Sequence, residues 1–149
     1  MRRSIVGIAV AIAAMAGAAR AADYVVVKST DPDIKAGLAL NGGQKVALGA
    51  GKTLTLIAAA GDVTTLKGGP SGATTPARRT AAADVGKLES LRTLIDPPPP
   101  GRTFGGRRGG VCPDPTTLKT LDDILAVQAD GCASAARQAL DALAGSAAH

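Results

Sequence analysis

The stretch Thr53-Leu54-Thr55-Leu56-Ile57-Ala58 decides the fold of this chain, because it begins by alternating polar and apolar side chains with the period of a β-strand. Successive side chains of a strand point to opposite faces of the sheet, so Leu54 and Leu56 share one face and the two threonines share the other. The pattern predicts a strand whose leucine face is buried and whose threonine face is in contact with water.

Other runs of β-forming residues surround this strand, at 24–29, 37–40, 45–48 and 63–67. Asn41-Gly42-Gly43 and Gly61-Asp62 accept positive φ, which suits hairpin turns between antiparallel neighbours. Gly68 to Arg79 is a loop by composition. We therefore expect a small glycine-rich antiparallel β module over residues 22–79.

A helix is predicted after this module, over residues 80–96, where it would pack on or near the sheet. Thr80 is the expected N-cap, and the helix must end before Pro97. Its apolar stripe is the set Val85, Leu88, Leu91 and Ile95, spaced three to four residues apart. Residues 97–111 combine prolines, glycines and arginines, and are predicted to be a flexible linker.

The remaining segment, residues 112–149, is predicted to be a helical hairpin. Asp114 and Pro115 suit the N-cap and first position of its first helix, and Asp130-Gly131 ends that helix. A second helix would follow and end before Gly145. The expected stripes are Leu118, Leu121 and Leu125 in the first helix, and Ala136, Leu140 and Leu143 in the second. The fold class predicted for the whole chain is α+β.

Residues 1–21 have the composition of a signal peptide. Arg2 and Arg3 form a positive start, residues 5–19 are apolar or small, and Ala19-Arg20-Ala21 fits the small-x-small pattern of a cleavage site. The apolar run is shorter than the ~20 residues that span a bilayer, so we expect cleavage and no membrane span in the mature protein. The predicted localisation is periplasmic or secreted.

Cys112 and Cys132 are the only cysteines, and export would place them in an oxidising compartment, where a disulfide is the usual state. We expect a bond within the chain; the alternatives are a bond between two chains or two free thiols. The single histidine is His149, so the chain offers too few ligands for zinc, and Asp31 and Asp33 indicate a turn rather than a calcium loop. No cofactor or metal is expected.

Gly51-Lys52-Thr53 resembles the end of a phosphate-binding loop, which reads G-x-x-x-x-G-K-[ST]. The first glycine position is occupied by Val46, and the residues after Thr53 alternate like a strand instead of opening a helix. No internal histidine can activate a serine nucleophile. The sequence therefore predicts neither a nucleotide site nor an enzyme.

The charge balance argues against nucleic acid as a partner. Of the formal net charge of +5, three charges are Arg2, Arg3 and Arg20 of the predicted signal peptide, which leaves +2 on the mature chain. Tyr24 and Phe104 are the only aromatic residues, too few to form a stacking platform for bases. The candidate anion-binding residues are the arginines of the two loop-like segments, Arg78, Arg79, Arg102, Arg107 and Arg108.

Residues 34–70 resemble the periplasmic β domains of FecR-type proteins. The resemblance lies in Gly37 opening a strand, Leu48-Gly49-Ala50-Gly51 before the alternating strand, Gly61-Asp62, and Gly68-Gly69-Pro70. It implies an extracytoplasmic sensing or interaction module and carries over no binding residue.

Together these features predict an exported, non-enzymatic envelope protein that acts as a protein-interaction or sensory module, with another envelope protein as its partner. The alternative is a module that binds an anionic envelope polymer or lipid headgroups through the candidate anion-binding arginines.

Overall fold

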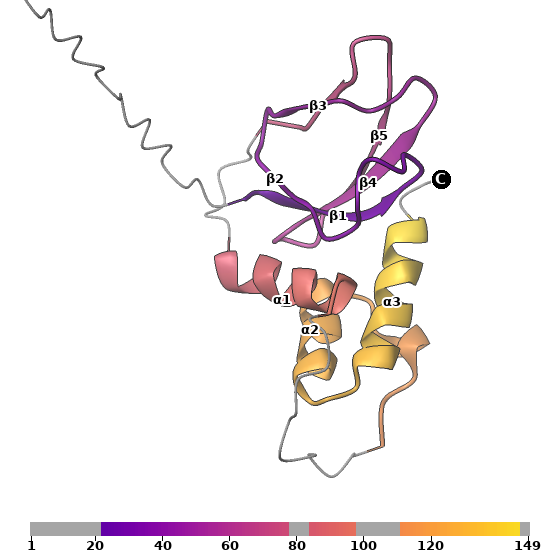
Figure 1. Cartoon of the computed structure of the whole chain (residues 1–149). Coiled ribbons are helices and arrows are strands. Elements are labelled where there is room, and N and C mark those ends of the chain that lie inside the picture. Colours follow the sequence, from indigo (N-terminus) through magenta and orange to yellow (C-terminus); the bar gives the residue numbers. More distant parts are fainter. Residues whose placement is uncertain (1–21, 78–83, 98–110, 147–149) are drawn as a thin grey trace, which may run out of the picture.

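The computed structural model describes residues 22–77, 84–97 and 111–146, and it confirms an α+β fold with antiparallel strands followed by helices (Figure 1). The predicted signal peptide and most of the predicted linker lie outside the described residues. The elements are, in chain order, β1 (Tyr24–Ser29), β2 (Ala39–Leu40), β3 (Lys45–Val46), β4 (Thr53–Ala58), β5 (Val63–Lys67), β6 (Ala73–Thr74), α1 (Val85–Ile95), a 3-10 turn η1 (Pro115–Thr117), α2 (Leu121–Ala129) and α3 (Ala133–Ser146).

The main sheet has the strand order β2-β1-β4-β5, and every pairing in it is antiparallel. Its centre is the β1–β4 pair, in which Val25 lies opposite Ile57 and Val26 opposite Leu56. The β4–β5 hairpin turns at Gly61, whose φ of 90° explains why glycine is required there.

A second, two-stranded sheet pairs β3 with β6. The composition of residues 68–79 predicts only a loop, so β6 was not expected. It forms because Gly72 approaches the Val46 carbonyl so closely that a Cβ would lie 2.4 Å from that oxygen, which brings Ala73 opposite Val46.

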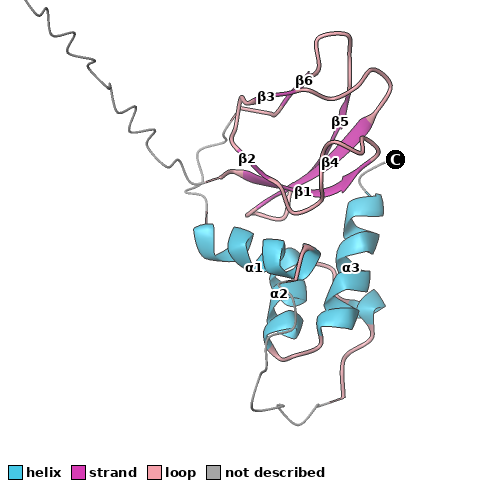
Figure 2. Cartoon of the chain, viewed as in Figure 1, coloured by secondary structure: helices cyan, strands magenta, loops and turns pink. Residues whose placement is uncertain are grey.

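Both faces of the main sheet are covered, and Figure 2 shows the helices on one side of it and β3 and β6 on the other. Val25 and Ile57 belong to a core shared with α1, α2 and α3, whereas Val26 and Leu56 belong to a core shared with β3. The prediction of a wet threonine face is therefore wrong. Thr55 is only 8% exposed, because the helical layer lies over the side of the sheet that it shares with Ile57.

Helix α1 is shorter than predicted. It begins at Val85 after Asp84, whose side chain accepts a hydrogen bond from the Lys87 N–H, while Thr80 lies outside the described residues. Val85 is 58% exposed and does not belong to the buried stripe. The buried residues of α1 are Leu88, Leu91, Leu94 and Ile95.

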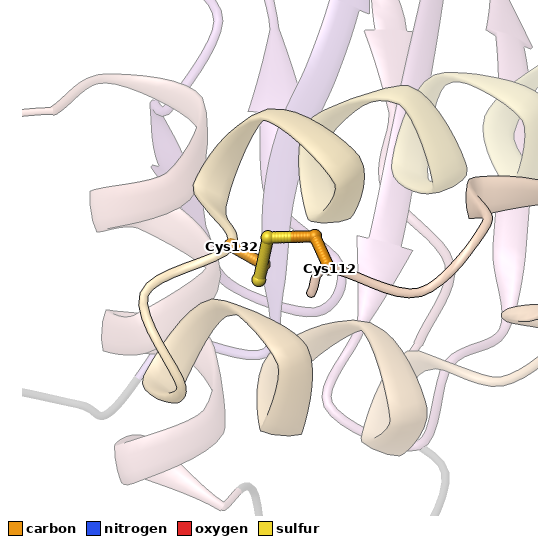
Figure 3. The surroundings of a disulfide bond; sticks show 2 residues. All are labelled: Cys112 and Cys132. Atoms are coloured by element: carbon orange, nitrogen blue, oxygen red, sulfur yellow. A yellow bond between two sulfur atoms is a disulfide. The ribbon is translucent and has the colours of Figure 1, made fainter. Parts of the chain in front are cut away.

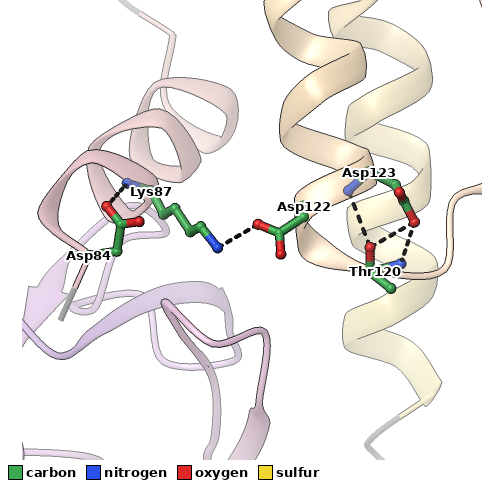
Figure 4. A network of polar contacts seen from close by, with 5 residues as sticks. All are labelled: Asp84, Lys87, Thr120, Asp122 and Asp123. Carbon is green, nitrogen blue, oxygen red and sulfur yellow. Dashed lines mark hydrogen bonds and ion pairs between the residues drawn. The ribbon is translucent and has the colours of Figure 1, made fainter. Parts of the chain in front are cut away.

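The C-terminal segment also begins differently from the prediction. Asp114 and Pro115 open the 3-10 turn η1 rather than a helix. Helix α2 starts at Leu121, after a capping box in which Thr120 and Asp123 satisfy each other's backbone N–H groups (Figure 4). The capping box was the stronger start signal, because it satisfies two backbone donors at once.

The turn between α2 and α3 agrees with the prediction at Asp130-Gly131. Gly131 has a φ of 93°, its N–H donates to the Gln128 carbonyl, and the Cys132 N–H donates to the Val127 carbonyl, which together form a Schellman motif. The second helix then continues through Gly145 to Ser146, one residue past the glycine predicted to follow its end.

Polar side chains join the helices to one another, and the Gln128 Nε2 of α2, for example, donates to the Ser90 carbonyl of α1 at 3.2 Å. The Arg137 guanidinium donates from Nη1 to the carbonyls of Leu94, at 3.0 Å, and Ile95, at 2.6 Å, and so satisfies acceptors at the C-terminal end of α1. The Lys87 ammonium pairs with Asp122 at the start of α2 (Figure 4). These contacts connect helices that come before and after the predicted linker.

Cys112 and Cys132 form a disulfide within the chain, as predicted, with their Cα atoms 5.7 Å apart (Figure 3). Cys132 immediately precedes α3 and its carbonyl accepts the Ala136 N–H, so the bond fixes the start of that helix. Two features bring the cysteines together. Gly131 reverses the chain after α2, and η1, which follows Cys112, packs along α3.

We predict that removing this disulfide destabilises the protein by about 3 kcal/mol, because the bond closes a loop of 20 residues in the unfolded chain. The variant Cys112→Ala/Cys132→Ala, compared with the oxidised protein in chemical denaturation, measures the loss. The oxidised chain should be two hydrogens lighter than the reduced chain in mass spectrometry. A disulfide-linked dimer, or equal stability of the two forms, would contradict the expectation.

Candidate functional site

The residues that the sequence singles out have different positions in the structure. Cys112 and Cys132 are bonded to each other. The candidate anion-binding residues Arg78, Arg79, Arg102, Arg107 and Arg108 all lie outside the described residues. Their role as an anion-binding group therefore stays a prediction.

Gly51-Lys52-Thr53 forms a turn into a strand. Gly51 has a φ of 75°, the Lys52 N–H donates to the Gly49 carbonyl, and Thr53 is the first residue of β4. A phosphate-binding loop depends on the N-terminus of a following helix, and a strand provides no such aligned dipole. The local geometry agrees with the prediction of a structural turn.

Asp31 holds two loops together. Its carboxylate accepts hydrogen bonds from the backbone N–H of Gly49, at 2.9 Å, and of Asp33, at 3.2 Å. These two donors, with the nearby Lys52 ammonium, lower the pKa of Asp31 below its ordinary value. The Asp31-Pro32-Asp33 segment is thus a turn, as predicted, and the described residues contain no group of three or more potential metal-ligating side chains.

A shallow, open hollow of about 400 Å³ lies between the β3–β4 loop and the β5–β6 turn. Its lining consists of Ala47, Leu48, Gly49, Ala50, Gly69, Pro70, Ser71 and Gly72. Ser71 is the only one of these residues with a polar side chain, so the hollow has little with which to orient a ligand. We assign no site to it.

The outer side of β5 offers a different kind of site. The Ala58 N–H donates to the Asp62 carbonyl and the Gly68 N–H donates to the Lys52 carbonyl, at the two ends of the β4–β5 ladder. Because hydrogen bonding alternates along an antiparallel strand, Asp62, Thr64, Leu66 and Gly68 direct their backbone groups toward β4. Val63, Thr65 and Lys67 direct theirs away from it.

On that outer side, Val63, Thr65 and Lys67 make no backbone hydrogen bond to any residue that the structure describes. β5 is an end strand of the main sheet, and β6, which follows it, pairs with β3 instead. We call the outward backbone groups of these three residues the β5 edge. Such an edge is a template for pairing with another strand.

Thr65, at the middle of the β5 edge, has a side-chain hydroxyl in an unusual environment. Its hydroxyl is buried and has no hydrogen-bond partner among the described residues, although Thr55 lies directly opposite on β4. By contrast, the buried Thr75 hydroxyl donates to the Asn41 carbonyl at 2.6 Å and accepts from the Gln44 N–H at 2.8 Å. The Thr75 hydroxyl is hydrogen-bonded and the Thr65 hydroxyl is not, so we expect the two hydroxyls to contribute differently to the stability of the fold.

The sequence predicted the strand 63–67 but could not show that its outer side is unpaired in the part of the chain that the structure describes. The alternation of Thr53 to Leu56 signals strands, whereas the position of β5 at the end of the sheet depends on where β6 pairs. The charged Lys67 at its end was the one available signal, since lysine is common on edge strands.

Comparisons with protein-family models, curated proteins and solved structures find no match to this chain. The resemblance of residues 34–70 to FecR-type domains accordingly stays a prediction. Within the described ranges, no helix is long and apolar enough to cross a membrane.

We predict opposite effects for the same substitution at the two buried threonines. Thr65→Val removes an unpaired hydroxyl while keeping the β-branched shape, so it should stabilise the fold by about 1 kcal/mol. Thr75→Val removes the buried hydroxyl that bonds both the Asn41 carbonyl and the Gln44 N–H, and it leaves these two groups only their 3.3 Å hydrogen bond to each other, so it should cost about 1–3 kcal/mol. Urea denaturation of both variants tests this pair, and a loss of stability in Thr65→Val would show that its hydroxyl is satisfied in solution.

The lowered pKa of Asp31 predicts a loss of stability in acid. Its contribution is complete above the ordinary aspartate pKa of about 3.9 and is lost as the pH falls through the lower, folded-state pKa. Asp31→Asn should be less stable than the wild type at neutral pH, and the difference should shrink as the pH drops below about 4. Asp33→Asn, whose side chain is exposed, is the matched control, and a difference for Asp31→Asn that does not change with pH would contradict the assignment.

Proposed function

We propose that this chain is an exported, non-enzymatic envelope protein that binds a protein partner by strand pairing along the β5 edge. The observation that carries the proposal is the row of outward backbone groups on Val63, Thr65 and Lys67, which have no backbone partner among the described residues. Strand addition gains affinity from main-chain hydrogen bonds and specificity from alternate side chains.

The side chains along the edge suit such pairing. Val63, Thr64, Thr65 and Leu66 are half-buried and β-branched or apolar, as strand-forming residues usually are. Only Lys67 is both charged and exposed within the strand. A partner strand would therefore meet an uncharged surface over most of its length.

The disulfide supports the predicted location. Cys112–Cys132 closes within the chain, and disulfides persist in oxidising compartments such as the periplasm and the extracellular space. The arginine-rich residues remain the basis of the alternative, in which the chain binds an anionic envelope polymer or lipid headgroups.

Site-specific photo-crosslinking in intact cells tests the proposal. A photoreactive residue at Thr65, in the middle of the β5 edge, should give a discrete protein adduct that mass spectrometry identifies. The matched control carries the same residue at Glu89, on the exposed side of α1, and should give none. A photoreactive residue at Val63 should give a second adduct. The variant Thr65→Pro lacks the outward N–H of residue 65 but keeps the β4–β5 ladder, and it should abolish that second adduct.

The opposite result has a clear form. If neither Thr65 nor Val63 crosslinks to protein while the chain is retained on an anionic polymer and released steeply by salt, the arginine alternative replaces the proposal.

A further inference from the structure

The disulfide has one exposed half and one buried half. Cys112 is exposed and follows Val111, which is fully exposed, whereas Cys132 has only 8% of its surface accessible (Figure 3). A thiolate breaks a disulfide by attacking one of its two sulfurs, and access helps to decide which sulfur is attacked. An incoming thiolate therefore meets Cys112 first.

Cys132 is placed to leave as a thiolate. It immediately precedes α3, a helix of 14 residues, and its carbonyl accepts the Ala136 N–H. The N–H groups before Ala136 have no acceptor within the helix and the first turn has no acidic side chain, so the N-terminus of α3 stabilises negative charge there. Burial opposes the charge, but part of the cover over Cys132 is Cys112 itself, which departs with the attacking thiol. Because a sulfur with a more stable thiolate leaves faster, the helix favours the loss of Cys132.

The segment that carries Cys112 has little else to hold it to α3. In the part of the chain that the structure describes, the hydrogen bonds of residues 111–117 stay within residues 114–118. The remaining contact is the packing of η1 along α3. Opening the disulfide therefore removes the covalent link between this segment and α3, while the hydrogen bond from Ala136 to the Cys132 carbonyl does not depend on the bond.

We propose that Cys112–Cys132 is a reversible redox site, opened when a protein dithiol attacks Sγ of Cys112 and Cys132 leaves as a thiolate. The dithiol sulfur bonds to Sγ of Cys112, the bond between the two cysteines breaks, and its electron pair goes to Sγ of Cys132. The second thiol of the dithiol then attacks its own partner sulfur in the mixed disulfide and releases Cys112. The dithiol is oxidised to a disulfide, the two cysteines are reduced by the same two electrons, and two protons pass through solvent.

A trapping experiment tests the site of attack. The probe is a purified thioredoxin whose second active-site cysteine is replaced by serine, so that the mixed disulfide cannot be resolved. It is mixed with the exported, disulfide-bonded protein, free thiols are alkylated, and the adduct is mapped by mass spectrometry. We expect thioredoxin on Cys112 and the alkyl group on Cys132 about tenfold more often than the reverse.

The matched control is the same reaction in urea at a concentration that unfolds the protein. Without the helix and the burial, both cysteines should form adducts in comparable amounts. Circular dichroism establishes that the protein is folded in the first reaction and unfolded in the second.

The rate of reduction by dithiothreitol tests whether attack occurs in the folded state. We expect a rate proportional to the concentration of dithiothreitol and nearly constant in urea below the unfolding transition. If the disulfide opened only on unfolding, the rate would rise steeply with urea, because unfolding exposes surface.

Three results would overturn the inference: no thioredoxin adduct on the folded protein, an adduct that does not favour Cys112, or a rate of reduction that follows unfolding. The proposed function is tested separately, because crosslinking at Thr65 and Val63 does not depend on how the disulfide opens.

Discussion

The β1–β4 ladder is buried on both of its faces, and the rest of the structure depends on that double burial. Val25 and Ile57 face the helices, while Val26 and Leu56 face the layer that contains β3 and β6. A strand pair that is apolar on both sides is stable only when two covering layers are in place. The helical layer and the small second sheet are therefore coupled to each other through this central pair.

The helices that cover one face are short, with 11, 9 and 14 residues in α1, α2 and α3, so they owe their stability to tertiary contacts more than to intrinsic propensity. Arg137 of α3 satisfies the last carbonyls of α1, and the disulfide fixes the start of α3. At Gly61, a Cβ would lie 3.3 Å from the Leu121 Cβ, so the β4–β5 hairpin packs closely on the beginning of α2. Hairpin, helices and disulfide thus support one another.

Among the described residues, the β5 edge is unpaired because of the way the chain leaves the main sheet after β5. Gly68 lies so close to Gly49 that a Cβ would approach the Gly49 carbonyl oxygen to 2.0 Å, and a Cβ on Gly72 would lie 2.4 Å from the Val46 carbonyl oxygen. These contacts carry the chain out of the plane of the main sheet, and β6 pairs with β3. β6 therefore belongs to the opposite layer, and no other strand of the described residues pairs with the outer side of β5.

The sequence by itself determined the features that depend on neighbours along the chain. The alternation from Thr53 to Leu56 marked β4, Gly61 and Gly131 marked two reversals, and the cysteine pair marked the crosslink. Each follows from side-chain period, from the φ that only glycine adopts easily, or from the scarcity of thiols. Helix starts were less certain, because Asp114 and Thr120 both offer caps, and α2 begins after Thr120, where Asp123 completes a capping box.

Only the tertiary structure decided which surfaces are covered. An alternating strand has the same sequence pattern whether its polar face contacts water or a helix, so the burial of Thr55 could not be inferred from its own segment. The pairing of β6 with β3, which leaves the β5 edge unpaired among the described residues, depends on close backbone approaches of Gly68 to Gly49 and of Gly72 to Val46, 19 and 26 positions apart in the chain. Strand order is a long-range property, because it is fixed by contacts that no local pattern encodes.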